Sequence, residues 1–326
     1  MPGPGKYIHW RKDLDPSACL SVDGDAPGEV HLSHWPGNRT PVQYPHDLST
    51  GSALLYVKDT AGMERAGRLK YVTNNHYDTD GVCSVFTILN PQAALEHAHL
   101  LTAAAAAGDF SLFTTPEGVK IDLTLTALTK AEGSPLRTAL FPDEYAARQA
   151  QYDHALQLLP RLFENPDLHA DWFADEYRVI QRDLRALRED EAEVEVLPAL
   201  DLAFVITDRP LHETAVNTAT SCDRILTVQP LNGSFLYDVR LTTLSWFQLV
   251  SRPYKLRLDW KALADSLEQQ ASGDGRWQAD ETSDPTPHLS FVDEHGQPAP
   301  NPAQPQVVKG IVARFFTQDP YLPAGI

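Results

Sequence analysis

The sequence contains few cysteines and no long apolar run. Its three cysteines, Cys19, Cys83 and Cys222, are scattered and form no C-x-x-C pair, which argues against a disulfide framework and predicts a reducing, cytoplasmic location. No stretch reaches the roughly 18 consecutive apolar residues that a membrane-spanning helix needs. The first residues, MPGPGKYIHW, contain neither a basic leader nor an apolar segment, so we expect no targeting peptide and no membrane partner.

Basic residues are scarce as well. The 27 Lys and Arg residues stand against 44 Asp and Glu residues, which gives a formal net charge of −17, and no run of basic residues is present. This balance opposes binding to duplex nucleic acid. The acidic excess concentrates in REDEAEVEVLP (188–198), a composition typical of a solvated helix end and linker.

Common catalytic motifs are missing too. The sequence has no Walker loop, no G-x-G-x-x-G and no G-x-S-x-G, and Val216 stands where a zincin helix beginning at His212-Glu213 requires its second histidine. An EF-hand loop that starts at His76 would have Thr87 at its twelfth position, where Glu is needed. The chemistry must therefore be sought in a less common arrangement.

The first part of the chain alternates predicted strands and helices. We predict strands over 28–34 and 68–75, a crossover helix over 49–59, a helix over 81–89 and another from Pro91 to Gly108. A strand followed by a tight loop and a helix is the pattern of a parallel sheet. We therefore expect an α/β domain over residues 1–210, with a parallel sheet flanked by helices.

The remainder of the chain has a different pattern of apolar residues and turn signals. The spacing of apolar residues predicts two amphipathic helices over 143–190, and the apolar run 200–208 is typical of a buried strand. Asn232-Gly233 joins two β-rich runs and predicts a hairpin. A strand and a helix are expected over 254–270, with loops beyond. These features predict a smaller α+β domain over residues 211–326.

One segment carries metal-capable side chains at regular spacing. NNHYDTDGVCS (74–84) places His76, Asp78 and Asp80 on alternate residues before Gly81, and alternate side chains of an extended segment point to one side. Oxygen-rich ligation with one or two imidazoles suits Mn²⁺ or Mg²⁺, or Fe and Zn in mixed sites. We predict that these three residues bind a divalent metal and carry the catalysis.

Further candidates follow from the topology. Ligands of parallel α/β sheets bind beyond the carboxyl ends of the strands, and His34 with the turn HWPGN follows the strand 28–34. Asp109 follows the helix that Gly108 is expected to end, where the helix dipole disfavours a carboxylate unless a cation is near. We predict Asp109 as a metal ligand. His34 and Arg39 are candidates for binding substrate, and the other candidates for holding metal are His34, Asp47 and Asp208.

Each candidate also has a purely structural interpretation. Asp80, which precedes Gly81, can be an ordinary helix N-cap, and Asp109 can be a turn residue. His31 or His34 can be a hydrogen-bonded histidine at a strand end, and Arg39 can be solvated at the surface. These alternatives remain open at the level of the sequence.

The segment HYDTDGVCS resembles the first motif of the DHH phosphoesterase superfamily. This resemblance implies a strand that delivers His76, Asp78 and Asp80 to a two-manganese site that activates water against phosphate esters, with Asp109 as the next carboxylate. AFVITDRPLH (203–212) is similar in outline to the strand that ends in the superfamily's Asp-His-His, with Asp208 as the matching Asp. In chain order HLSHWPGNRTP, NNHYDTDG and AGDF also resemble a bacterial family of unknown function.

Two superfamily features are absent from the sequence. Arg209-Pro210 stands where two histidines are expected, and no GGGH loop follows the stretch that ends near residue 270. We therefore predict a metal-dependent hydrolase, a phosphoesterase of a small phosphorylated molecule. The alternatives are a non-catalytic ligand-binding or regulatory protein on a degenerate phosphoesterase scaffold, and a structural strand-helix junction that binds no metal.

Overall fold

The chain divides into two compact units. The computed structural model describes residues 5–253, 257–270 and 274–318. Unit 1 comprises Met1–Val179 and Phe247–Pro253, and unit 2 comprises Ile180–Trp246 and Tyr254–Ile326. The division falls within the continuous helix α8 (Ala170–Arg188), before the boundary expected at residue 210, and a short later segment returns to unit 1.

Unit 1 contains a four-stranded parallel sheet, which confirms the predicted α/β class. Its strands pair in the order β1-β4-β2-β3, and every pairing is parallel. The two predicted strands are β3 (Val30–Leu32) and β4 (Tyr71–Asn74). They are not neighbours, because β2 (Cys19–Val22) lies between them, and β1 (Lys6–His9) forms one edge. Neither β1 nor β2 follows from the sequence patterns above.

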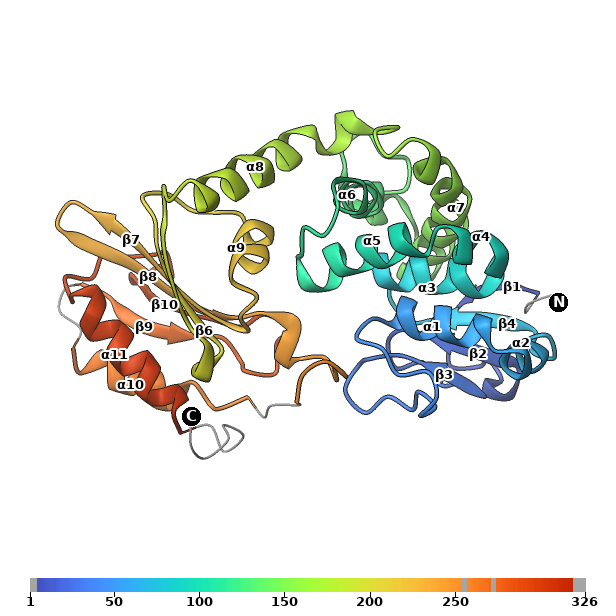
Figure 1. Cartoon of the computed structure of the whole chain (residues 1–326), viewed down its shortest axis with the longest axis horizontal. Coiled ribbons are helices and arrows are strands. Elements are labelled where there is room, and N and C mark those ends of the chain that lie inside the picture. Colours follow the sequence, from blue (N-terminus) through green and yellow to red (C-terminus); the bar gives the residue numbers. More distant parts are fainter. Residues whose placement is uncertain (1–4, 254–256, 271–273, 319–326) are drawn as a thin grey trace. The chain divides into compact units, whose positions relative to one another are not determined.

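Helices pack on this sheet and on one another (Figure 1). α1, α3 and α7 contact the strands directly. The predicted helices 49–59 and 81–89 are present as α1 and α3, whereas the one from Pro91 to Gly108 is divided into α4 and α5. The bounds are α1 (Ser49–Lys58), α2 (Thr60–Ala66), α3 (Thr79–Leu89), α4 (Pro91–Glu96), α5 (Ala98–Phe110), α6 (Pro116–Lys130) and α7 (Glu144–Glu164).

The expected helix end at Gly108 is wrong. α5 continues to Phe110, so Asp109 lies within its last turn. A Cβ on Gly108 would lie 3.0 Å from Thr79 Cβ and 3.1 Å from Asp122 Oδ1. This glycine therefore allows α5 to approach α3 and α6 closely, and it does not terminate the helix.

Unit 2 contains a six-stranded mixed sheet in the order β5-β6-β7-β8-β10-β9. Among the described strand pairs of this sheet, only β6–β7 is parallel. The predicted hairpin is confirmed, with Asn232 and Gly233 at φ 49° and 82° between β7 and β8. The strands are β5 (Glu193–Leu197), β6 (Leu202–Ile206), β7 (Arg224–Leu231), β8 (Ser234–Leu241), β9 (Arg276–Ala279) and β10 (His288–Val292).

The chain beyond residue 270 is rich in loops, as expected, but it also contains two strands and a helix that the sequence patterns did not indicate. β9, β10 and α11 (Pro305–Phe316) lie there, and Trp277, Leu289 and Phe291 are buried in the core. Short strands between Pro- and Gly-rich turns gave little periodicity to detect. Residues 254–256 of the strand expected before α10 (Lys261–Glu268) lie outside the described residues, and residues 257–259 are not a strand.

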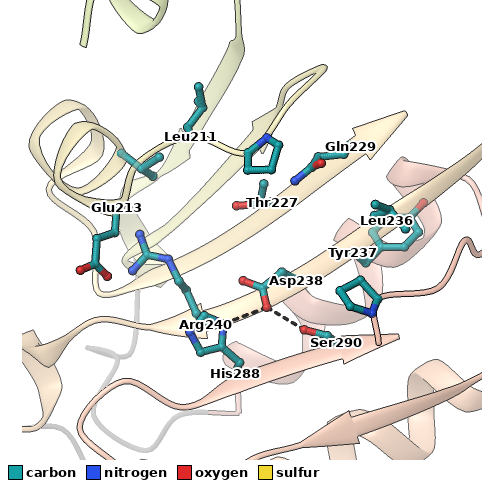
Figure 2. A pocket seen from close by; sticks show the side chains of 13 residues that line it. Leu211, Glu213, Thr227, Gln229, Leu236, Tyr237, Asp238, Arg240, His288 and Ser290 are labelled. Carbon is teal, nitrogen blue, oxygen red and sulfur yellow. Dashed lines mark hydrogen bonds and ion pairs between the residues drawn. The ribbon is translucent and has the colours of Figure 1, made fainter. Parts of the chain in front are cut away.

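The two faces of this sheet are covered differently. α10 and α11 pack over one face and bury its main core, while α9 (Glu213–Thr220) covers part of the opposite face with Val216 against Ala203, Val205 and Ile225. The uncovered part of that face opens into a cavity (Figure 2). Within the described part of the chain, no helix is long and apolar enough to cross a membrane.

Candidate metal centre

Three strands of the parallel sheet end at one cluster of side chains. β2 is followed directly by Asp23, β3 is followed two residues later by His34, and β4 is followed two residues later by His76. The carboxyl ends of parallel strands meet at one edge of the sheet, where ligands of such folds bind. The expected meeting of the His34 loop with the 76–80 segment therefore occurs, with Asp23 from the intervening strand.

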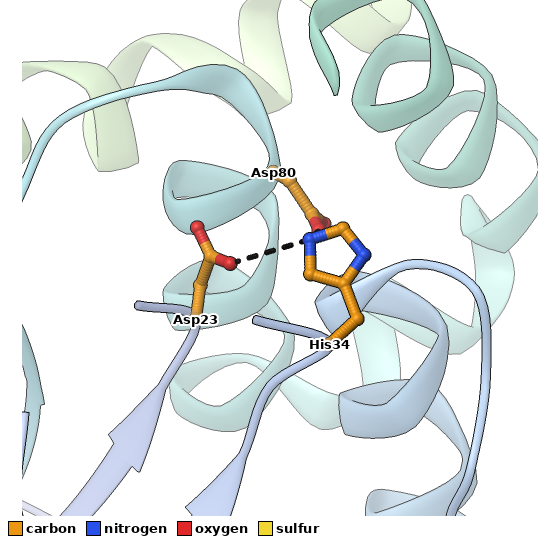
Figure 3. Close-up of side chains that lie close together, drawn as sticks. All are labelled: Asp23, His34 and Asp80. Carbon is orange, nitrogen blue, oxygen red and sulfur yellow. Dashed lines mark ion pairs between the residues drawn. The ribbon is translucent and has the colours of Figure 1, made fainter. Parts of the chain in front are cut away.

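A first group consists of Asp23, His34 and Asp80. His34 Nε2 lies 3.7 Å from Asp23 Oδ1 and 3.6 Å from Asp80 Oδ2. All three side chains are fully buried, and Figure 3 shows both carboxylates close to the imidazole ring. Their ligand atoms lie within 4.8 Å of one another, a spacing that fits atoms about 2–2.6 Å from a common cation.

A second group shares Asp23 with the first. His76 Nε2 lies 2.9 Å from Asp23 Oδ2 and 2.7 Å from Asp78 Oδ2, and these three residues also meet the 4.8 Å spacing. Asp23 thus directs Oδ1 toward His34 and Oδ2 toward His76. A carboxylate that faces two ligand groups is suited to bridge two cations, as in two-metal sites with ions about 3.5–4 Å apart.

The turn after β2 fixes Asp23 in this position. Asp23 has φ 52° and Gly24 has φ 68°, a left-handed conformation that Asp and Gly tolerate better than other residues. A Cβ on Gly24 would lie 2.1 Å from Asn75 Oδ1, so only glycine lets this turn approach the loop after β4. Ser49 Oγ donates to Asp23 Oδ1 at 2.8 Å.

Backbone contacts orient His34. Its Nδ1 lies 2.5 Å from the carbonyl oxygen of Asp47, which can only accept, so Nδ1 donates this hydrogen bond and Nε2 is directed toward the carboxylates. Nε2 is buried and has no hydrogen bond. Phe247 stacks on the ring with 3.9 Å between centroids, and Gln248 N donates to the His34 carbonyl at 2.8 Å.

Asp47 holds the returning segment of unit 1 beside His34. Its Oδ1 accepts hydrogen bonds from Val250 N at 2.7 Å and from Ser251 N at 2.9 Å. Its carboxylate thus binds this segment while its carbonyl oxygen orients the imidazole. The sequence makes Asp47 a candidate metal ligand, but it belongs to neither ligand group. Its carbonyl oxygen instead orients the His34 imidazole, as supporting residues do for histidines in metal sites.

Asp78 and Asp80 have structural partners in addition to the histidines. Asp78 is the N-cap of α3 and accepts from Gly81 N at 2.7 Å. Asp80 accepts from Ser49 N at 2.7 Å and Thr50 N at 2.8 Å, and so caps α1 rather than its own helix. The expected alternative that Asp80 caps the helix that follows it is therefore wrong, because Asp78 is that N-cap, and Asp80 caps α1 instead. Capping does not exclude ligation, because each carboxylate has about four lone-pair positions.

Asp109 joins the cluster from the last turn of α5. Its Oδ2 lies 3.1 Å from His34 Nε2, and the residue is 8% exposed. Burial and the carboxylates of Asp80, Asp78 and Asp23 raise its pKa well above the ordinary value, and the C-terminal end of a helix adds to that effect. The fourth predicted ligand thus lies with the cluster, as expected.

The cluster holds more negative charge than its surroundings balance. Burial raises the pKa of Asp80, and Asp23 raises it further. Burial also raises the pKa of Asp23, but His76, His34 and Ser49 together lower it below the ordinary value. Burial lowers the pKa of His76, while Asp78 and Asp23 raise it well above the ordinary value. A cation between these groups would relieve the same repulsion.

Other predicted residues belong to neither ligand group. Asp208 is exposed after β6 in unit 2 and belongs to neither group. Arg209 beside it forms an ion pair with buried Asp183 at 2.5 Å, a structural role. Arg39 is exposed, and its backbone N–H donates to His31 Nδ1 at 3.1 Å. His31 Nε2 lies 3.1 Å from the Gly24 carbonyl oxygen, so His31 is the hydrogen-bonded strand-end histidine.

Asp23 is the residue that the sequence patterns did not single out. It follows the four-residue strand CLSV, which is buried throughout and lacks alternation. The signal available was an apolar tetrapeptide followed by Asp-Gly. Such a signal is short, but it repeats the strand-then-acid arrangement found at 71–80.

Comparison with known proteins places the chain in a family without assigning an activity. A family model described as a family of unknown function, DUF6687, matches residues 4–320. The chain therefore belongs to this family, which agrees with the resemblance to a bacterial family of unknown function. No curated protein matches the chain.

Proposed function

We propose that this member of DUF6687 is a metal-dependent hydrolase that cleaves phosphate esters of a small molecule at a two-cation centre bridged by Asp23. The observation that carries the proposal is the pair of ligand groups that share one buried carboxylate. The chemistry of the donors, carboxylate oxygen with one imidazole in each group, suits Mn²⁺ or Mg²⁺.

The residues of the cluster divide into two ligand sets. Asp23 Oδ1, His34 Nε2 and Asp80 Oδ2 would hold one cation, with Asp109 beside them, and Asp23 Oδ2, His76 Nε2 and Asp78 Oδ2 would hold the other. Divalent cations at such a centre lower the pKa of bound water and polarise a phosphoryl oxygen. The protein keeps the imidazoles in place through Asp47 and Trp35, whose ring lies 4.8 Å from that of His76.

The resemblance to the DHH phosphoesterase superfamily supports the substrate class. The His-x-Asp-x-Asp-Gly motif lies at a strand-to-helix junction, as that resemblance implies. The strand-delivered histidine that Arg209-Pro210 does not provide is supplied by His34, which follows β3 and precedes the first motif in the chain. The missing histidine pair therefore does not leave the cluster without a second imidazole.

The test is a screen of phosphodiesters and phosphomonoesters with Mn²⁺ on the wild type and on the double variant Asp78→Asn plus Asp80→Asn. Asparagine at position 78 retains an acceptor oxygen for Gly81 N, which caps α3. At position 80 its single oxygen can accept from only one of Ser49 N and Thr50 N, so thermal unfolding of the double variant is measured beside its activity to verify that it is folded. The control is Asp143→Asn, because Asp143 caps α7 through Ala146 N at 2.8 Å and lies in no ligand group.

We expect turnover of at least one ester class by the wild type and the control, with a loss of at least about 100-fold in the double variant. Equal background in all three proteins, together with measurable Mn²⁺ affinity in the wild type, would favour the alternative of a non-catalytic binding protein. Absence of both turnover and Mn²⁺ binding would leave a purely structural junction.

A further inference from the structure

Unit 2 contains a cavity of about 420 Å³ that the proposed metal centre does not use. Its floor is the part of the sheet face that α9 leaves uncovered, and its wall includes Leu211 and Glu213 at the start of α9. All of its lining residues belong to unit 2. Its volume falls in the range of about 300–1,000 Å³ that small-molecule sites occupy.

The floor is polar because of the strand register. Thr227 of β7, Asp238 of β8 and Ser290 of β10 form one cross-strand row, and Arg240 pairs with His288 in the adjacent row. Alternate residues of these strands, such as Val239 and Leu289, point into the core on the other face. Figure 2 shows Asp238 and Arg240 projecting from β8 into the cavity.

Arg240 is the unusual member of this floor. It is 7% exposed, and its guanidinium donates through Nη2 to Asn217 Oδ1 at 2.6 Å. Burial lowers its pKa, while the carboxylates of Glu213, Asp238 and Asp223 act in the opposite direction. A guanidinium has five N–H donors, and this buried cation lines the cavity, where an oxyanion can accept from it.

Donors and acceptors lie beside this cation. Asp238 Oδ1 accepts from Ser290 Oγ at 2.7 Å and lies 2.9 Å from His288 Nδ1. This arrangement holds the Asp238 carboxylate in one orientation at the cavity floor, since both partners bind the same oxygen. The cavity thus presents a fixed guanidinium fork, which matches carboxylate and phosphate geometry, next to a fixed carboxylate that accepts from hydroxyl groups.

We propose that this cavity binds a small organic oxyanion, with its carboxylate or phosphate on Arg240 and its hydroxyl groups on Asp238 and neighbouring polar side chains. A sugar phosphate and a hydroxy acid share this chemistry. The site is complete within unit 2 and does not depend on the proposed hydrolase activity.

The experiment is isothermal titration calorimetry of the full chain in chelator with three probes: ribose 5-phosphate, malate and inorganic phosphate. Arg240→Met removes the guanidinium, and Leu236→Trp fills the cavity from β8 without changing any charge. Arg276→Met is the matched control, because Arg276 is exposed on β9 and does not line the cavity. Thermal unfolding verifies that each variant is folded.

We expect one of the organic probes to bind the wild type and Arg276→Met with the same Kd. Its Kd for Arg240→Met and for Leu236→Trp should be at least about ten-fold higher. The preferred organic probe then identifies phosphate or carboxylate as the group on Arg240. If Arg240→Met does not fold, Leu236→Trp decides. The proposal is overturned if no probe binds the wild type with a Kd below about 10 mM. It is also overturned if inorganic phosphate binds as tightly as the organic probes, or if Arg240→Met and Leu236→Trp bind the probe as tightly as Arg276→Met does.

Discussion

The bridging position of Asp23 yields a sharp prediction for Asp23→Asn. Asparagine has nearly the same shape, tolerates the left-handed backbone at φ 52°, and can still accept from Ser49 Oγ. The variant therefore removes one negative charge with little change in geometry. Because Asp23 faces both His34 and His76, we expect both cations to be lost together, whereas a ligand of one group alone would affect only one.

The expected loss in Mn²⁺ affinity follows from the charge that is removed and its distance from the cations. A divalent cation and one negative charge about 4 Å apart interact by about 8 kcal/mol at an effective dielectric of about 20, and relief of the repulsion among Asp23, Asp80 and Asp109 offsets more than half of that loss. We expect each cation to bind about 2–4 kcal/mol more weakly, which is roughly 30- to 900-fold in Kd.

The assay is calorimetric titration of chelator-treated protein with Mn²⁺. Asp25→Asn is the matched control, because Asp25 is exposed in the same loop, contacts Asn75 and belongs to neither group. It should bind within about two-fold of the wild type. Wild-type stoichiometry and affinity in Asp23→Asn would refute the bridging role.

Two further variants test the surroundings of the centre, and a third tests Asp208, which belongs to neither ligand group. In Asp47→Ala, loss of the bonds from Val250 N and Ser251 N should lower the free energy of unfolding by about 2 kcal/mol in urea titrations at neutral pH. Burial raises the pKa of Asp47, but hydrogen bonds from Ser251 and Val250 lower it below the ordinary value. The difference in stability between wild type and Asp47→Ala should therefore be present above about pH 4 and vanish as pH falls through the folded pKa of Asp47. A constant difference down to about pH 2 would contradict the role given to the Asp47 carboxylate. Gly24→Ala places a Cβ 2.1 Å from Asn75 Oδ1 at φ 68°. We expect it to lower the free energy of unfolding by about 2 kcal/mol or more, measured by thermal unfolding. An unchanged Tm would contradict this expectation. Asp208→Ala should leave Mn²⁺ affinity and stability within about 0.5 kcal/mol of the wild type, and a large loss of affinity would restore Asp208 as a ligand.

The sequence predicted the parts of the centre that lie on strong periodic signals. The strand, the alternate spacing of His76, Asp78 and Asp80 and the amphipathic α3 together identified these three residues, and the βα pattern located His34 at the same sheet edge. The extended segment expected over 76–80 is wrong, however, because Thr79 and Asp80 already lie in the first turn of α3. Asp109 followed from its place near a helix end, although α5 extends beyond Gly108. These signals are local, which is why they can be seen without coordinates.

Features set by tertiary contacts were not predictable in this way. Asp23 follows a strand of four buried residues, too short for any period to appear. Asp80 caps α1 from a different helix, a pairing between residues 30 apart in the chain. Asp208 does follow a true strand, β6, but that strand belongs to the mixed sheet of unit 2. Strand identity is local, whereas the sheet that a strand joins is not.

Anomalous scattering at the Mn edge from crystals grown with Mn²⁺ tests the shared carboxylate most directly. The account predicts two peaks about 3.5–4 Å apart, one bounded by Asp23, His34 and Asp80 and the other by Asp23, His76 and Asp78, each with an Asp23 oxygen at about 2–2.6 Å. No peak at the cluster, or peaks that Asp23 does not contact, would contradict it.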